Sequence, residues 1–332
     1  KYNDIWEKTD ATGCTTMKPI SWDYRFSNLC NFKCRMCGDM LSSSWESEQK
    51  LHDMADLTDP KNNWMKPEVR AEITKFQDTQ IEQEFSEAVE EHRVEEIYWV
   101  GGEPLMYEQH WRYMKRIVEL GDARRLYARY NSNLSRVNYK GVNLFRDILS
   151  HTRDWQMCAS LDGTGAIGEY IRTGLKYNEW VDNFKQGLEI ATHRRQMRID
   201  FTLTLPGMLD VANVQKLADE LDVDILAKVV FTFTPDIIMS PLALPREILN
   251  SLVDELITNN KLGDALSSVL LQLKNRPNME ETYHGDEYWK GMRKGKRRML
   301  ELESIRKNNL CMRDILSTKT DILKWWDSID VR

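Results

Sequence analysis

Residues 24–38 read YRFSNLCNFKCRMCG, and this stretch holds three cysteines, Cys30, Cys34 and Cys37, within eight residues. The chain has six cysteines in all, and the other three are isolated: Cys14, Cys158 and Cys311. A disulfide framework normally serves a small secreted domain and spreads its cysteines along the chain. The clustering in this 332-residue chain therefore indicates a metal centre in a reducing compartment, and we expect a cytoplasmic protein.

The spacing of the three cysteines is Cx3Cx2C, which lets one compact loop wrap around three corners of an iron-sulfur cubane. Because a cubane has four irons, three thiolates leave one iron open, whereas electron-transfer ferredoxins normally use four cysteines. A structural zinc site normally closes with four ligands, and the motif itself contains no fourth Cys or His. The spacing therefore favours a 4Fe-4S cluster held by Cys30, Cys34 and Cys37, with zinc as the alternative.

Outside the motif, short β-prone runs alternate with longer helical patterns, as in repeated βα units around a parallel sheet. The six predicted strands are Trp22 to Leu29, Glu95 to Val100, Arg125 to Tyr130, Trp155 to Leu161, Arg198 to Leu205 and Lys228 to Thr234. The helices predicted between them are Glu68 to Glu91, Tyr107 to Leu120, Tyr139 to Leu149, Glu179 to Arg194 and Val211 to Leu221. This order predicts an α/β fold, a partial (β/α)6 TIM-type barrel whose strand-end loops collect on one face.

After about Pro235 the strand pattern stops and helical patterns follow. The predicted helices are Pro245 to Thr258, Leu262 to Leu273, Glu287 to Lys307 and a short one around Asp321 to Trp326. The expected parts are an N-terminal segment over 1–21, the partial barrel over 22–240 and a helical C-terminal extension over 241–332. Because the sequence begins with Lys1 rather than Met, we expect further residues upstream.

Glycine-rich or polar turns follow the second, third and fourth predicted strands. They are Gly101, Gly102, Glu103 and Pro104 in GGEP, then Asn131, Ser132 and Asn133 in NSN, then Ser160 and Asp162 in SLDG, with Arg172 ten residues further on. Paired glycines let a backbone approach a ligand closely, and amide and hydroxyl groups can hydrogen-bond a ligand. Taken alone, each group is also typical of an ordinary turn, a helix cap or a surface arginine.

Together these motifs resemble the radical S-adenosylmethionine (SAM) superfamily, and the resemblance covers about Trp22 to Thr234. It implies that SAM chelates the open iron of the cluster through its amino and carboxylate groups. One departure is Met36, because the residue before the third cysteine is usually aromatic. A thioether packs on adenine comparably well, so Met36 is expected to contact SAM.

The resemblance also implies a role for each strand-end turn. It assigns the SAM ammonium to Gly101, Gly102, Glu103 and Pro104, the ribose or carboxylate to Asn131, Ser132 and Asn133, the ribose to Ser160 and Asp162, and the carboxylate to Arg172. A planar guanidinium fork suits the last task. The weaker candidates are Thr202, Thr204 and Thr232, since β-branched strand residues usually serve packing.

Within the superfamily, the sequence around residues 24–38 is most similar to the twitch and SPASM groups. Relatives in these groups carry several C-terminal cysteines for auxiliary clusters, whereas this chain has only Cys311 there. One interpretation of Cys14 is a remnant of the cysteine-rich segment that precedes the barrel in some relatives. Cys158 lies inside a predicted strand and is interpreted as a buried structural thiol.

Composition and charge narrow the classes of partner. Hydrophobic residues make up 41% and charged residues 30%, and no apolar run approaches the roughly 18 residues that would indicate a membrane span. A net charge of −6 argues against nucleic acid as a partner. The basic run Arg293 to Arg298 is interpreted as a solvated helix face, although it could grip an acidic peptide or phosphate. Trp325 and Trp326 are interpreted as anchors of the last helix, with a partner contact as the alternative.

The expected function follows from the resemblance. An electron from flavodoxin or ferredoxin would reduce the cluster, SAM would be cleaved to a 5′-deoxyadenosyl radical, and this radical would abstract hydrogen from a peptide or protein. The peptide substrate rests on analogy with the twitch and SPASM groups alone. A small molecule such as a nucleotide or sugar is the alternative substrate, and a non-catalytic iron-sulfur or zinc protein that binds a partner is the alternative class.

Overall fold

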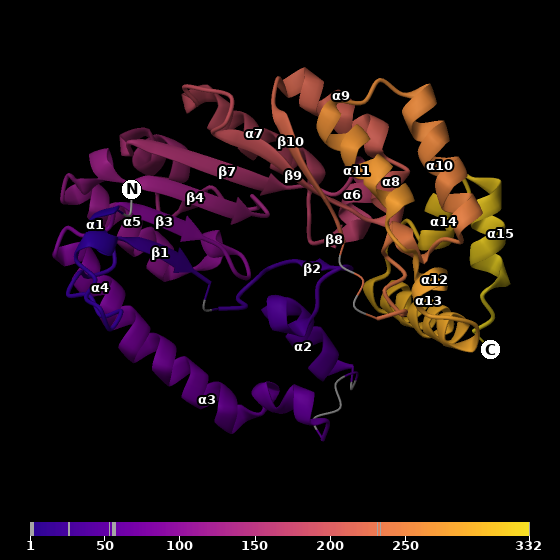
Figure 1. Ribbon diagram of the computed structural model, residues 1–332, viewed down its shortest axis with the longest axis horizontal. Helices are drawn as coiled ribbons and strands as arrows, with labels where there is room; N and C mark the ends of the chain where they lie inside the picture. Colours follow the sequence, from indigo (N-terminus) through magenta and orange to yellow (C-terminus); the bar gives the residue numbers. More distant parts are fainter. Residues whose placement is uncertain are drawn as a thin grey trace.

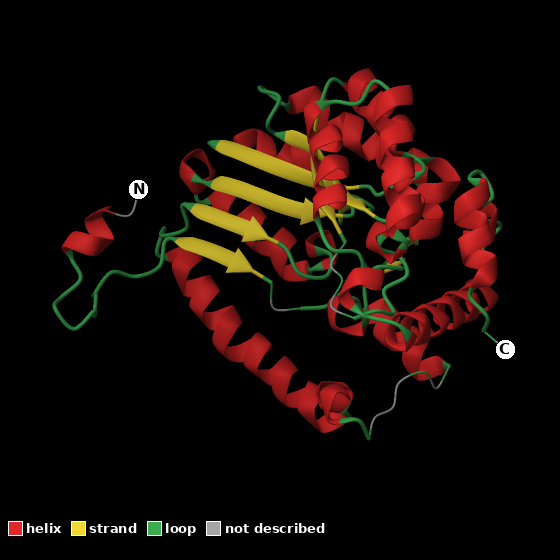
Figure 2. Ribbon diagram, turned by 45° about the vertical axis from the view of Figure 1, so that its right-hand side comes forward, coloured by secondary structure: helices red, strands yellow, loops and turns green. Residues whose placement is uncertain are grey.

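The computed structural model describes residues 3–25, 27–52, 54, 58–230, 232 and 234–331. Its centre is one sheet of six parallel strands in the order β1-β3-β4-β7-β9-β10 (Figure 1). The strands are β1 (Ser21–Tyr24), β3 (Glu96–Trp99), β4 (Tyr127–Ser132), β7 (Asp154–Ser160), β9 (Met197–Leu203) and β10 (Asp224–Val229). Because all neighbours are parallel, the carboxyl ends meet at one edge of the sheet, as the arrowheads in Figure 2 show. The sheet and its helices form the partial (β/α)6 barrel that the sequence predicts.

The first five predicted strands are confirmed, although β1 ends at Tyr24, before the predicted Leu29. The sixth strand is displaced toward the N-terminus, because β10 spans Asp224–Val229 and not Lys228 to Thr234. Alternate residues of β10 are exposed at the edge of the sheet, so the strand lacks the apolar run on which the prediction depended. The predicted first and sixth strands also include residues outside the described part of the chain: Phe26, Phe231 and Phe233.

The two faces of the sheet differ in character. On one face, large side chains such as Trp99, Tyr130 and Phe201 are fully buried, and the first two contact His110 of helix α5 (Glu108–Glu119). On the other face, which we call the lumen face, most alternate residues are polar and only partly buried, although Cys158 and Asp200 are buried. The partly buried ones include Glu96, Tyr98, Arg129, Asn131, Gln156, Ser160, Arg198 and Thr202. A closed barrel would fill this space with apolar layers, and this open sheet does not.

Most of the helices predicted between the strands are confirmed. They are α5, α7 (Tyr177–Ile190), α9 (Val211–Leu221) and a long helix made of α3 (Pro67–Phe76), the π-helical segment η3 (Gln77–Ile81) and α4 (Glu82–Glu90). The apolar stripe of α5 packs on the sheet through Trp111, Met114 and Ile117, which are all buried. The helices therefore cover one face of the sheet, as crossover connections require.

The predicted helix from Tyr139 to Leu149 is wrong in its first half. The chain instead forms a hairpin of β5 (Asn138–Tyr139) and β6 (Val142–Asn143), followed by the π-helical segment η6 (Leu144–Ile148). Lys140 and Gly141 have φ values of 46° and 83°, the left-handed backbone that a two-residue hairpin turn requires. Asn143 then caps η6, because its side chain accepts two backbone N–H groups of that segment.

The four helices predicted after Pro235 are confirmed, and Figure 1 shows the C-terminal helices gathered beyond β10. They are α10 (Arg246–Asn259), α11 (Asp264–Asn275), α13 (Asp286–Arg306) and α15 (Thr320–Ser328). Leu249, Leu270 and Trp326 are buried and belong to the same apolar core as the sheet. The last helices are therefore packed onto the barrel by a shared core.

Short elements complete the fold. They are α1 (Asn3–Glu7), β2 (Lys33–Cys34), η1 (Asp39–Leu41), α2 (Ser43–Leu51), η2 (Pro60–Met65), η4 (Pro104–Met106), η5 (Asp122–Arg125), η7 (Leu149–His151), α6 (Gly165–Ile171), β8 (Arg172–Thr173), α8 (Leu205–Met208), η8 (Pro241–Ala243), α12 (Met279–Thr282) and α14 (Met312–Leu316). Among the described residues, no helix has both the length and the apolar character needed to cross a membrane.

Candidate functional site

The carboxyl edge of the sheet surrounds a hollow of about 210 Å³. Most of the site residues predicted from the sequence line it: Cys30, Cys34, Cys37, Gly101, Gly102, Glu103, Asn131, Ser132, Asn133, Ser160 and Arg172. Of the remaining three, Pro104 is buried at the start of η4, Asp162 is buried behind Arg172, and Met36 lines a neighbouring hollow. The fold therefore gathers residues that are far apart in the sequence at one place.

The loop that carries the cysteines, residues 29–38, is held by backbone contacts on two sides. Its strand β2 pairs antiparallel with β8, so that Cys34 lies opposite Arg172. The N–H of Arg35 donates to the carbonyl of Ile171 at 2.8 Å, and Trp45 Nε1 donates to the Cys34 carbonyl at 2.7 Å. Two segments distant in sequence thus fix the middle cysteine.

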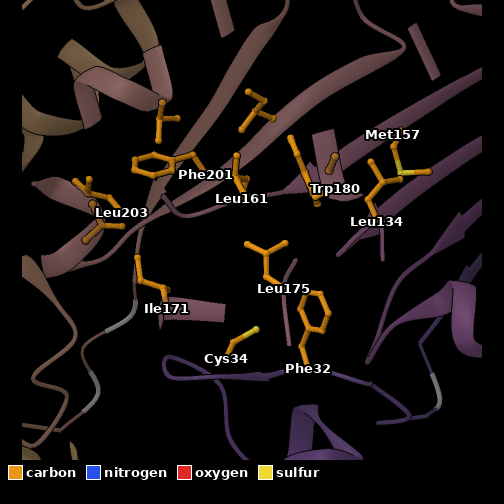
Figure 3. Packing of buried hydrophobic residues seen from close by; sticks show 14 of the residues in the cluster. Phe32, Cys34, Leu134, Met157, Leu161, Ile171, Leu175, Trp180, Phe201 and Leu203 are labelled. Carbon is orange, nitrogen blue, oxygen red and sulfur yellow. The ribbon is translucent and has the colours of Figure 1, made fainter. Parts of the chain in front are cut away.

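Apolar packing holds the same loop from inside. In Figure 3 the side chains of Phe32 and Cys34 rise from the loop toward Leu175. Phe32 is 1% exposed and Cys34 5% exposed, so both belong to the core. Full burial of a phenylalanine side chain stabilises a fold by about 2 kcal/mol. The loop is therefore positioned by the protein itself.

The three thiols have different environments. Burial raises the pKa of Cys30 to about 12, and the Phe32 N–H donates to its Sγ at 3.4 Å. Cys34 and Cys37 share a side-chain hydrogen bond, which lowers the pKa of Cys34 and raises that of Cys37. Arg172 Nη1 lies 3.8 Å from Cys34 Sγ, and its positive charge favours the thiolate form of Cys34.

The three thiols line the hollow, but they are not arranged around one common position. Among the described residues, no three His, Cys, Asp or Glu side chains are arranged to hold a single metal ion. A single zinc ion needs its donors within about 2.3 Å. The three thiols are soft donors, of the kind that transition metals and iron-sulfur clusters take.

The GGEP segment lies directly against the cysteine loop. The N–H of Gly102 donates to Ser27 at 3.0 Å, and the N–H of Glu103 donates to Leu29 at 2.7 Å. A Cβ at Gly102 would lie 2.6 Å from the carbonyl carbon of Asn28, so no larger residue fits without moving the backbone. The close approach expected of these glycines is thus toward the loop as well as toward the hollow.

Glu103 joins the ends of two strands. Its carboxylate, 1% exposed, accepts from Ser132 Oγ at 2.7 Å, from the Leu105 N–H at 3.1 Å and from the Asn133 N–H at 2.6 Å. Burial raises its pKa to about 7, against these hydrogen bonds. The Asn133 amide donates to Asn31 of the cysteine loop at 3.0 Å, so the turn after β4 is tied to both neighbours.

Asp162 and Arg172 form a buried ion pair behind the hollow. Arg172 Nε lies 2.7 Å from Asp162 Oδ2, and the two side chains are 11% and 0% exposed. Asp162 Oδ1 accepts from the Thr202 N–H at 2.8 Å. Burial raises the pKa of Asp162, and the charge of Arg172 opposes this rise. The alternative interpretation of Arg172 as a surface arginine is therefore wrong.

A row of polar side chains on the lumen face forms the floor of the hollow. Tyr98 OH donates to Asn131 Oδ1 at 2.7 Å, and Asn131 Nδ2 donates to Asp200 Oδ2 at 3.0 Å. Lys228 Nζ lies 2.8 Å from both oxygens of Asp200. Asp200 and Lys228 were not predicted as site residues, although an acid within the apolar strand MRIDFTL was a usable signal.

The end of α13 braces the cysteine loop. Arg306 is 1% exposed at its side chain, and its Nη2 lies 2.7 Å from Glu48, which is 4% exposed. Arg306 Nη1 also donates to the Lys33 carbonyl at 2.8 Å, and the guanidinium lies 4.4 Å from the centre of the Trp45 ring. A buried ion pair between residues this distant in sequence could not be predicted from local pattern.

A second hollow of about 330 Å³ adjoins the first. Met36, Cys37 and Leu41 line it from one side, and Ile238 and Met299 line it from the segment after β10 and from α13. Met36 therefore faces a space bounded by the barrel and the C-terminal helices.

Other residues singled out in the sequence have structural positions. Trp325 and Trp326 are buried, which confirms that they anchor the last helix. The basic run from Arg293 to Arg298 is not wholly solvated, because Lys296 is 8% exposed and its Nζ donates to the carbonyls of Trp326 and Ile329 at 2.6 and 2.9 Å. The isolated cysteines lie as follows: Cys158 is buried in β7, Cys14 is exposed, and Cys311 precedes α14.

No protein-family profile and no curated protein matches the chain. Among solved structures, it is similar to SuiB of Streptococcus suis bound to S-adenosylmethionine, with 16% identity and a TM-score of 0.42 over 73% of this chain and 48% of that one. It is also similar to SuiB bound to the precursor peptide SuiA, with 15% identity and a TM-score of 0.42 over 77% of this chain and 51% of that one. For SuiB itself the identity is 16% and the TM-score 0.42, over 80% of this chain and 55% of that one. The chain thus spans about half the length of SuiB, and a likeness at this level assigns it neither a family nor an activity.

Proposed function

We propose that this chain is a radical SAM enzyme that holds a 4Fe-4S cluster through Cys30, Cys34 and Cys37 and binds SAM beside it. One observation carries the proposal: all three thiols of the Cx3Cx2C loop line a single hollow at the carboxyl edge of a parallel βα sheet. The loops at this edge form the active sites of βα barrels.

The donor set fits such a cluster. Thiolates are the ligands that iron-sulfur clusters use, and three of them leave one iron corner for SAM. Arg172 stabilises the thiolate of Cys34 in a site that is otherwise costly for negative charge. When bound and reduced by a flavodoxin or ferredoxin, the cluster supplies the electron that cleaves SAM to methionine and a 5′-deoxyadenosyl radical.

The chain's own residues orient SAM and exclude water. We assign the SAM ammonium to the backbone of residues 101–104, and its carboxylate to Arg172, whose Nε is already fixed by Asp162. The polar wall at Asn131, Asn133 and Ser160 offers hydrogen bonds to the ribose. The hollow beside Met36 offers apolar side chains, among them Ile238 and Met299, on which an adenine ring can pack.

We propose a peptide or protein as the substrate. The lumen face supports this because it is polar and partly exposed, so the space below the hollow is not filled by core side chains. We also propose that the enzyme belongs to a twitch-type subgroup and is cytoplasmic. Its proposed parts are an N-terminal segment that ends at residue 21, a partial barrel that ends at residue 240 and a helical C-terminal extension.

The test is SAM cleavage by protein reconstituted with iron and sulfide under anaerobic conditions. After reduction, wild type should release 5′-deoxyadenosine, and a Cys30→Ala/Cys34→Ala/Cys37→Ala variant should release none. Cys158→Ala is the matched control, because Cys158 is a buried cysteine of the same barrel outside the lining of the hollow. If the protein carries a reduced cluster and still never yields 5′-deoxyadenosine, the proposal that it is a radical SAM enzyme is refuted. Added peptides that accelerate the release would support the peptide substrate.

A further inference from the structure

The lumen face carries two arginines whose Nε atoms are buried and have no hydrogen-bond partner, Arg129 on β4 and Arg198 on β9. The strand between them is β7, where Cys158 pairs with Arg198 on one side and with Asn131 on the other. Asn131 is two residues beyond Arg129, and alternate residues of a strand share a face. The two arginines are therefore one strand apart on the same face.

Tyr127 and Cys158 each lie near enough to both arginines to be influenced by their charges. Burial raises the pKa of Tyr127 and of Cys158, and the charges of Arg129 and Arg198 oppose the rise in both cases. Tyr127 and Arg198 also line a hollow of about 670 Å³ at the amino ends of the strands, together with Gln156. Arg198 is thus accessible from a space large enough for a ligand. Arg129 does not line this hollow, but its side chain is 39% exposed.

Other charged side chains near Arg129 and Arg198 form shorter ion pairs than these two arginines do. The pairs are Lys228–Asp200 at 2.8 Å, Arg194–Asp222 at 2.8 Å and Arg194–Asp224 at 2.9 Å. Arg129 reaches Glu96 only at 3.4 Å, through Nη2, and its Nε stays without an acceptor. A buried guanidinium N–H without an acceptor is costly. Two of them at one place indicate that an acceptor comes from outside the chain.

We infer that Arg129 and Arg198 form an anion-binding site in the lumen, which takes a carboxylate or phosphate group of a ligand. Guanidinium groups bind both anions through charge-assisted hydrogen bonds in a planar fork. Only one step rests on the function proposed above: if the chain is that enzyme, the site anchors its substrate below the cofactor hollow. The anion is then an acidic group of a peptide or a phosphate of a small molecule.

The test is isothermal titration calorimetry of the full chain, which is not reconstituted with iron and sulfide. The two probes are pyrophosphate and tri-glutamate. At least one probe should bind wild type, and Arg129→Gln and Arg198→Gln should each raise its Kd by about tenfold or more, because each removes a charged hydrogen bond. Binding of tri-glutamate alone indicates a peptide carboxylate, and binding of pyrophosphate alone indicates a phosphate.

The matched control is Arg194→Gln, since Arg194 lines the same hollow but is paired with Asp222 and Asp224. It should leave the Kd within about twofold. Failure of both probes to bind wild type would overturn the inference, as would tri-glutamine binding as well as tri-glutamate or equal losses in all three variants. A lower melting temperature of unliganded Arg198→Gln would also overturn it, because Arg198 would then have partners within the fold. None of these outcomes depends on SAM cleavage, so the site and the proposed enzyme fail separately.

Discussion

Three consecutive residues of β4 show how differently the two faces of one sheet are built. Tyr130 is 0% exposed, and its hydroxyl lies 3.0 Å from Nε2 of His110, which is also fully buried. Its neighbours Arg129 and Asn131 point the other way, into the lumen, and are only partly buried. On the helix-covered face the protein encloses even its polar groups. On the lumen face several polar and charged side chains, such as Arg129 and Asn131, stay partly exposed, although Asp200 is buried.

The difference separates what holds the fold from what is available for chemistry. Apolar burial drives folding, so the helix-covered face carries most of the free energy of the sheet. The lumen face contributes less, because partly exposed polar groups gain little from folding. Substitutions on the two faces should therefore differ in kind, and four experiments sharpen or break this contrast.

The largest effect is expected from adjacent residues of β9. Phe201→Ala removes a fully buried ring and should lower the free energy of unfolding by about 4 kcal/mol, as large-to-small core substitutions do. Thr202→Ala removes a partly buried lumen side chain and should cost less than about 1 kcal/mol. Urea denaturation followed by circular dichroism measures both. Equal losses would break the contrast between the faces.

His110 makes stability on the helix-covered face depend on pH. Burial lowers its pKa from 6.5 to about 3, so between these values the unfolded chain binds a proton that the folded chain does not. Stability contributed by this residue is therefore lost as the pH falls, by about 3 kcal/mol from pH 6.5 to pH 4. His110→Gln should remove this component, seen as the difference between wild-type and variant unfolding curves across that range. A difference independent of pH would contradict the neutral, buried state of His110.

The third-largest effect is expected where Gly102 of the GGEP segment packs closely against the start of the cysteine loop. Gly102→Ala would place a Cβ 2.6 Å from the Asn28 carbonyl carbon and should cost about 2 kcal/mol, since the backbone must move. Gly38→Ala, at the far end of the same loop, meets nothing within 4 Å and should be close to neutral. Thermal unfolding distinguishes the two. Tolerance of both substitutions would show that the loop is not fixed by this contact.

The smallest effect is expected on the exposed rim of the lumen face. Arg25 and Asp23 form an ion pair at 2.5 Å with side chains 58% and 50% exposed. Arg25→Gln should change the free energy of unfolding by less than about 0.5 kcal/mol, and less still in 1 M salt. Denaturation at low and high ionic strength measures this. A loss of the size expected for Phe201→Ala would mean that the lumen face also supports the fold.

Sequence patterns predicted the fold where the signal was local. The helix from Val211 to Leu221 was predicted with its observed ends, because its apolar period of 3.6 residues is unbroken. The turn at Lys140 and Gly141 was missed because its left-handed backbone interrupts what looks like a helical pattern. The displaced strand β10 was missed because an edge strand with exposed alternate residues carries little apolar signal.

The candidate site was predictable for a related reason. The cysteines and the GGEP segment stand in short motifs, and parallel strands bring their loops together. Arg306 and Glu48, by contrast, meet only because α13 folds back onto the cysteine loop, and no local pattern encodes that contact. The two arginines of the lumen face whose Nε atoms have no hydrogen-bond partner also had no sequence signature, since an arginine in a strand is usually solvated.

The most direct test of the central claim is electron paramagnetic resonance of the reduced, anaerobically reconstituted protein with and without SAM. If three thiolates hold a cubane and leave one iron open, the wild type should give a reduced iron-sulfur signal that changes when SAM binds. An iron-sulfur signal that SAM leaves unaltered, or a protein that binds zinc and gives no such signal, would contradict it.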